Sequence, residues 1–174
     1  MISALLISLF TLNSPALAEE KDPLALNKKV VQFVDANMGK KVYEGEAVDL
    51  PLEALKASGA KWKFPNETIF GQEVNTRRED IEPGDIIQFD NAEYENKETK
   101  VGWKFQNNSV VVISVDKKEN KIKFATQNLF SKLYVTTHDL EMNTLRRGNL
   151  KIYRPQPGTP DDEVKTDDKA EKNN

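Results

Sequence analysis

The sequence predicts an α+β domain in which N-terminal helices pack on one side of a curled antiparallel sheet. Two observations lead to this fold class. Two segments with helical spacing of apolar residues come first in the chain. After a Pro-Gly-Asp turn at 83–85, the chain changes to short β-branched and apolar runs that are separated by polar turns. Helices followed by a run of strands are typical of the α+β class.

The first helix is predicted to span about residues 22–37. Asp22 is a suitable N-cap, and Pro23 is preorganised for the first helical position. Gly39 is expected to end the helix. One face of this segment is apolar with helical spacing and comprises Leu26, Val30, Phe33 and Val34.

The second helix is predicted to span about residues 48–58. Gly59 is its stop signal, and Pro51 is tolerated because it falls in the first turn. Ala47 is therefore expected at the N-terminus of this helix. There the backbone N–H groups and the helix dipole favour negative charge.

The rest of the domain is predicted to be mostly strands. Residues 61–82 lack a clear period and are expected to form a long excursion, and residues 90–100 are expected to form a polar loop. A short helical turn is predicted within 139–145. The predicted strands are 86–89, a hairpin of 109–115 with 121–125, and then 134–137 and 150–153.

Both ends of the chain differ in composition from the domain, which is predicted to cover residues 19–154. Residues 1–18 resemble a secretory signal peptide, with an apolar stretch and an Ala16-Leu17-Ala18 cleavage site, although they contain no Lys or Arg. This predicts export, to the periplasm or outside the cell. No other apolar run is long enough for a transmembrane segment. Residues 155–174 are rich in Pro and charge and are predicted to be a disordered tail.

Composition excludes several functions. The 174 residues contain no cysteine and one histidine, His138, so a thiol nucleophile and the usual zinc sites are excluded. We predict no metal site and no cofactor. The net charge is −3, and residues 155–174 alone carry six acidic and three basic residues. The domain itself is therefore about neutral, which argues against nucleic acid as a partner.

Several blocks between about residues 30 and 155 carry a resemblance to a known superfamily. No block is specific alone, but their order and spacing together resemble the CHAP-type and related papain-like cysteine amidases and peptidases. The blocks are Gly45-Glu46-Ala47-Val48-Asp49-Leu50, Pro83-Gly84-Asp85-Ile86-Ile87-Gln88-Phe89, Asn107-Asn108-Ser109-Val110-Val111-Val112, Thr126-Gln127-Asn128 and the closing strand from Gly148 to Pro155. The resemblance implies a papain-like fold with helices packed on a curled sheet.

The departures from the family pattern concern the catalytic residues. The resemblance places Ala47 where these enzymes have their cysteine, Asn108 where they have the base histidine, and Thr126 at a third histidine position. Thiol catalysis needs a thiolate and a base in contact, and neither is present. A laboratory Cys-to-Ala change would explain Ala47 alone. The sequence therefore favours a natural pseudoenzyme.

The resemblance also implies a cleft that once held peptides, and hence a binding or accessory module. Its candidate ligands are a peptidoglycan stem peptide or a protein partner. Aromatic side chains at a cleft suit stacking on sugar or peptide, although Trp103 fits core packing equally well. The candidate ligand-binding residues are Tyr43, Glu46, Trp103, Asn108 and Gln127.

Two alternative functions remain open from sequence. A hydrolase could use the carboxylates Glu44, Glu46 and Asp49, or Ser109, although helix capping explains such carboxylates more simply. Ser109 would need a base, and His138 is expected on a surface loop outside the catalytic blocks. Alternatively, the domain could be an adaptor that uses its outer surface.

Overall fold

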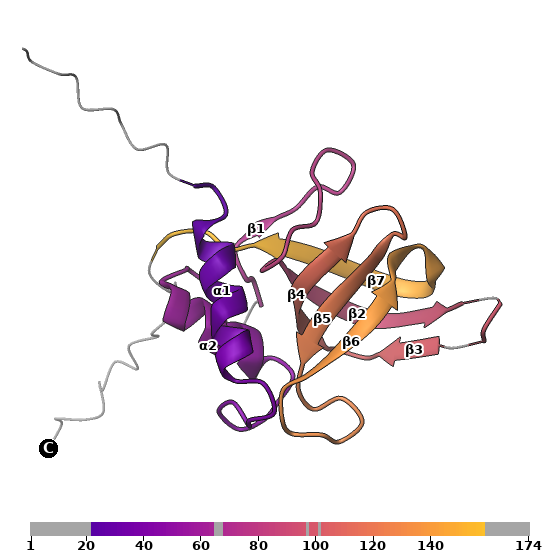
Figure 1. Ribbon diagram of the computed structural model, residues 1–174, viewed down its shortest axis with the longest axis horizontal. Coiled ribbons are helices and arrows are strands. Elements are labelled where there is room, and N and C mark those ends of the chain that lie inside the picture. The colour runs from indigo at the N-terminus through magenta and orange to yellow at the C-terminus, as the bar shows by residue number, and fades with distance from the viewer. Residues whose placement is uncertain (1–21, 65–67, 97, 101, 159–174) are drawn as a thin grey trace, which may run out of the picture.

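The computed structural model describes residues 22–64, 68–96, 98–100 and 102–158, and it has an α+β architecture. Helices α1 (Ala25–Ala36) and α2 (Asp49–Ser58) lie together on one side of a curled, seven-stranded antiparallel sheet (Figure 1). The predicted fold class is confirmed. The predicted signal peptide lies outside the described residues, as does the predicted tail from residue 159 onward.

Helix α1 begins three residues later than predicted. The Asp22 carboxylate accepts a hydrogen bond from the Leu24 N–H (2.9 Å), so Asp22 caps a turn before the helix. The apolar face is as expected, with Val30 and Val34 fully buried. Asn27 is buried on the same face, which the apolar pattern did not predict.

Helix α2 agrees with the prediction to within one residue. Gly59 ends it in the left-handed conformation with φ 76°, which glycine adopts without steric cost. Pro51 is the third helical residue, where the N–H that it lacks has no partner within the helix. Ala47 lies two residues before the first helical residue, as predicted.

The sheet has the order β1-β7-β2-β4-β5-β6, and β3 pairs with β2 beyond the end of β4. The hairpin predicted at 109–125 is confirmed. The strands are β1 (Gln72–Glu73), β2 (Ile86–Glu95), β3 (Gly102–Phe105), β4 (Ser109–Asp116), β5 (Lys121–Thr126), β6 (Thr136–Glu141) and β7 (Leu145–Arg154).

The prediction of a polar loop at 90–100 is wrong for the first half of that segment. Strand β2 continues to Glu95, because after an irregularity at Asp90–Glu93 it buries Ala92 and Tyr94 and pairs with both β3 and β7. Strand β7 likewise starts earlier than predicted, and β6 is shifted toward the C-terminus. The predicted helical turn is reduced to one 3-10 turn, Met142–Thr144.

Alternation along the strands divides the core into two clusters. Val111 and Ala125 face the helices and pack with Val30, Leu50 and Leu55. Val110, Val112 and Phe124 face the inside of the curl. This alternation decides which side chains of β4 and β5 can face α2. Neither described helix is long and apolar enough to cross a membrane.

Candidate functional site

The turn before α2 holds Ala47 in a partly enclosed position, with 9% of its surface exposed. The Asp49 carboxylate accepts a hydrogen bond from the Glu46 N–H (2.9 Å), and the Asp49 N–H donates to the Glu46 carbonyl oxygen (3.1 Å). Gly45 has φ 92° and approaches Leu133 closely. The turn thus places residue 47 at the helix N-terminus, where a thiol would be activated, but the side chain present is a methyl group.

Gln127 fixes this turn to the sheet. Its side-chain N–H groups donate to the carbonyl oxygens of Val42 (3.0 Å) and Glu46 (2.8 Å), and its oxygen accepts from the Val42 N–H (3.2 Å). The side chain is fully buried. Gln127 was predicted to contact a ligand, but the structure gives it no exposed surface and uses both of its side-chain N–H bonds to hold backbone.

The alternation of side chains determines which positions of these two strands face the helix layer. Ser109 has the parity of Val111, and Gln127 has the parity of Ala125, so both lie on the helix side of the sheet. Asn108 and Thr126 have the opposite parity. The positions facing the helix layer are therefore Ser109 and Gln127, each one residue after the position assigned from sequence.

The side chains of Asn108 and Thr126 serve local structure. The Asn108 side-chain oxygen accepts a hydrogen bond from the Gln106 N–H (3.1 Å). The Thr126 hydroxyl is fully buried, 3.2 Å from the Gln127 carbonyl oxygen. Neither amide nor hydroxyl can exchange a proton near pH 7 as imidazole does. These side chains have a structural role, and the strand register explains why.

His138 is on strand β6, half-buried, and the expectation of a surface loop is wrong. It pairs with Phe124, whose ring faces the inside of the curl, and its ring lies 5.2 Å from that of Trp103. Burial lowers the pKa of His138, and the charge of Lys132 lowers it further. Ser109 faces the helices, so His138 is not placed to act as its base.

The three carboxylates near the turn have separate partners. Asp49 lies in the first turn of α2 and accepts a hydrogen bond from the Glu46 N–H, but no side chain caps the helix N-terminus, so the capping interpretation holds only for the favourable position of Asp49 at the helix dipole. Glu46 accepts a hydrogen bond from the Asn128 side chain (2.7 Å), and Glu44 lies 4.0 Å from Lys41. This arrangement ties the loops together and gives no support to an acid/base pair. Within the described ranges, no three His, Asp or Glu side chains cluster to hold a metal ion.

Comparison with known families identifies the family of this chain. The sequence model of the AIM3/BBC1 cysteine proteinase-fold domain matches residues 24–160. The chain belongs to this family. The papain-like cysteine proteinase fold implied by the sequence blocks is thereby confirmed.

Similarity beyond the AIM3/BBC1 family is distant. No curated protein matches the chain. Among solved structures, the chain is similar to that reported as "The crystal structure of Ly7917", with 16% identity and a TM-score of 0.45. The match covers 73% of this chain and 62% of the other.

The Pro-Gly-Asp block of this AIM3/BBC1 domain is a structural junction. Asp85 is fully buried, and its carboxylate accepts hydrogen bonds from the Arg154 guanidinium (2.9 and 3.1 Å) and from the Asn27 side chain (2.9 Å). The bond to Asp85 raises the pKa of Arg154. A Cβ on Gly84 would lie 2.4 Å from the Asn27 carbonyl oxygen, so glycine is required for α1 to approach β2.

Two of the candidate aromatic residues lie in different surroundings. Trp103, on β3, stacks with Phe105 and contacts Phe124, Phe130 and His138, so it packs at the mouth of the curl. It also lines an open cleft of about 830 Å³ between β2, β3 and β7. Tyr43 precedes the nucleophile turn and is 71% exposed. Only Tyr43 of this pair is in the loop next to Ala47.

Sequence reasoning missed the loop between β5 and β6. Residues 128–135 run beside residues 38–46 and carry the exposed side chains of Phe130, Leu133 and Tyr134. The available signal was a run of apolar residues directly after the Thr126-Gln127-Asn128 block, where a polar loop would be expected. That run was assigned in part to a strand.

Proposed function

We propose that this domain is an exported, non-catalytic cysteine proteinase-fold domain that binds a protein partner or a cell-wall peptide near its former nucleophile turn. The observation that carries the proposal is the content of the site: a methyl group at Ala47, facing a sheet that presents Ser109 and Gln127. None of these groups can supply both a nucleophile and its base.

The preserved geometry supports binding. Gln127 makes three hydrogen bonds to the loop before Ala47, so the turn is fixed to the sheet. A rigid turn with exposed Tyr43 and Glu46 beside it suits recognition of a peptide or a folded partner. Neither rescued serine chemistry nor a carboxylate mechanism is supported by a specific contact.

The activity test compares the purified protein with two restored variants. We expect no hydrolysis of peptidoglycan or amide substrates by the wild-type protein. Ala47→Cys with Ser109→His should give a thiol that is alkylated faster at pH 6–7 than in Ala47→Cys with Asn108→His, because residue 109 faces the helix layer and residue 108 does not. Circular dichroism of each variant checks that it is folded.

Wild-type turnover that is lost in Glu46→Gln or Ser109→Ala would contradict the non-catalytic assignment. Equal thiol reactivity in the two restored variants would instead refute the deduced orientation of Ser109.

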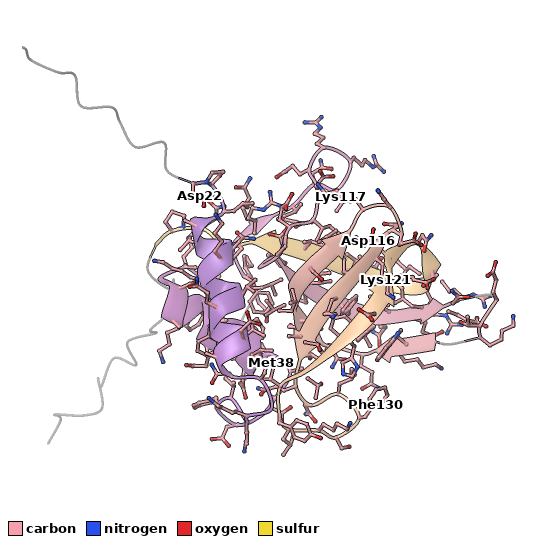
Figure 2. The ribbon with its side chains drawn as sticks, in the orientation of Figure 1. Asp22, Met38, Asp116, Lys117, Lys121 and Phe130 are labelled. Carbon is pink, nitrogen blue, oxygen red and sulfur yellow. The ribbon has the colours of Figure 1, made fainter. Side chains whose placement is uncertain are left out.

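The cell-wall ligand is tested by calorimetric titration with soluble peptidoglycan stem peptides. If the turn binds them, Tyr43→Ser and Glu46→Gln should each weaken binding, and Lys117→Ser, at the opposite end of the molecule in Figure 2, should leave it unchanged. The absence of any heat of binding at millimolar peptide would leave a protein partner as the proposed ligand.

A further inference from the structure

The exposed apolar side chains of this domain are concentrated on one surface. Six large hydrophobic side chains are exposed within the described ranges, and five of them belong to segments 38–46 and 128–135. Figure 2 places Met38 and Phe130 at the end of the molecule opposite to Asp22 and Lys117. We call this surface the loop face: Met38, Tyr43, Phe130, Leu133 and Tyr134.

The two segments form one continuous surface because they are bonded to each other. The Gly39 N–H donates to the Val135 carbonyl oxygen (3.0 Å), and the Val135 N–H donates to the Lys40 carbonyl oxygen (2.9 Å). Further along, Gly45 closely approaches Leu133, and Asn128 bonds Glu46. The exposed side chains are therefore presented by a fixed platform.

The backbone of the loop face is strained at its two most exposed aromatic residues. Tyr43 has φ 49° and Phe130 has φ 54°, in the left-handed region that bulky residues rarely adopt. Outside segments 38–46 and 128–135, the described non-glycine residues in this region are Asn91 and Asn120, which tolerate it, and Lys100. The Phe130 ring lies 5.9 Å from Trp103 and 6.3 Å from His138, so packing within the monomer offsets part of its cost. Among the described residues no ring contact of this kind offsets the cost at Tyr43, and such strain is characteristic of functional sites.

The charges around the loop face indicate what covers it. Its segments carry Lys40, Lys41 and Lys132 together with Glu44 and Glu46, so the rim is of mixed charge and close to neutral. An anionic membrane or an acidic peptide would select a cationic rim instead. A mixed rim around Tyr, Phe, Met and Leu has the composition of a protein–protein interface.

A second copy of the chain fits this rim. In a two-fold interface the same surface meets itself, so lysines of one copy can lie beside glutamates of the other. The net charge of −3 for the whole chain adds little repulsion between copies. We propose that the loop face is the contact between two copies of this chain in a two-fold dimer.

The size of the loop face sets the expected affinity. Segments 38–46 and 128–135 are shorter together than the roughly 20–30 residues per side of a standard interface. We therefore expect a weak dimer with a dissociation constant of about micromolar order. The inference does not depend on whether the domain is catalytic, but the dimer would cover Tyr43, which the proposed function also uses. The two proposals are distinguished because self-association is measured without ligand and peptide binding with dilute, monomeric protein.

The experiment is analytical ultracentrifugation of the full chain over about three decades of concentration. The wild-type mass should rise from 19.7 kDa toward twice that value. Tyr43→Asn and Phe130→Asn, which place a polar residue that tolerates the left-handed conformation, should each raise the dissociation constant at least about tenfold. Leu145→Asn removes an exposed apolar side chain outside the loop face and should change nothing.

Three outcomes would overturn the inference. The first is a wild-type protein that remains monomeric at the highest concentration. The second is a dimer that Tyr43→Asn and Phe130→Asn leave intact. Because every variant contains the same apolar N-terminal segment, this result would assign association to that segment or to another surface. The third is a monomer that binds phosphatidylserine vesicles through Tyr43, which would make a membrane the occupant.

Discussion

Pro83-Gly84-Asp85 and Gly45-Glu46-Ala47 both resemble family signatures, but they have different roles in the structure. The first is closed: Asp85 is fully buried, and Arg154, Asn27 and the Glu82 N–H all donate to it. The second is held in place from behind by Gln127 and opens to the surface beside exposed Tyr43.

The two blocks differ in what holds them in place. The Asp85 junction joins α1, β2 and β7, so its loss would affect the whole domain. At the turn, replacing a thiol by a methyl group removes a reaction but no structural contact. The bonds that shape this turn come from Gln127 and Asp49, whose side chains do not depend on residue 47.

Asp85→Ala should have the largest effect. It removes the charged acceptor of the partly buried Arg154 guanidinium and one of the two acceptors of the buried Asn27 side chain, which should lower the free energy of unfolding by about 3–5 kcal/mol. Urea denaturation measures this loss. Asp80→Ala, which removes an exposed ion pair with Lys117, is the control and should have little effect. Equal losses in the two variants would mean that the junction is no stronger than a surface pair.

Gln127→Leu tests the other half of the comparison. The change removes three hydrogen bonds, leaves the Val42 N–H without its partner, and should cost about 2–3 kcal/mol in urea denaturation. Glu46→Ala removes the single bond between the Glu46 carboxylate and the Asn128 side chain at the more exposed side of the same loop, without placing alanine at the left-handed Asn128, and should cost about 1 kcal/mol or less. If the two losses are alike, the turn does not depend on Gln127.

Tyr43→Asn should have a smaller effect of opposite sign. It relieves a strained backbone without removing a buried contact, so the monomer should gain about 1 kcal/mol in free energy of unfolding. The measurement requires dilute protein, because association would stabilise the wild type and mask the gain. A loss of stability would show that Tyr43 packs on its own chain.

His138→Gln should have the smallest effect, and only at acid pH. The folded state lowers the pKa of His138 below its ordinary value of 6.5, so the unfolded chain takes up the proton first as the pH falls. The wild type should therefore lose stability between about pH 6.5 and the folded pKa, in addition to the losses from its carboxylates. The melting temperature should fall less between pH 7.5 and pH 5 in the variant than in the wild type. An equal fall in both proteins would mean that His138 does not contribute to the pH dependence of stability.

The sequence predicted the elements whose signals are local. Helix α2 was predicted to within a residue because Pro51 and Gly59 mark its two ends, and the β4–β5 hairpin was predicted from its apolar run and polar turn. The late part of β2 was missed. Its residues Asp90, Asn91 and Glu93 are polar, and only pairing with β3 and β7 makes them a strand.

The candidate site was predicted in position but not in register. Ala47 was expected at the start of a helix and is there. The positions assigned from sequence, Asn108 and Thr126, have the parity opposite to that of Val111 and Ala125, which face the helices, and a block match does not say which face of a strand a side chain occupies. From the sequence, Trp103 fitted either ligand stacking or core packing. The contacts of its ring with Phe105 and His138 favour packing.

By itself, the sequence determined the fold class and the absence of a thiol and of any histidine at the matched catalytic positions, because these follow from local patterns and from the identity of single residues. The tertiary structure decided which side chains face α2, that Asp85 and Gln127 hold backbone and neighbours together, and that two distant loops form one exposed aromatic surface. These features depend on strand register and on contacts between residues far apart in the chain, and no local pattern encodes either.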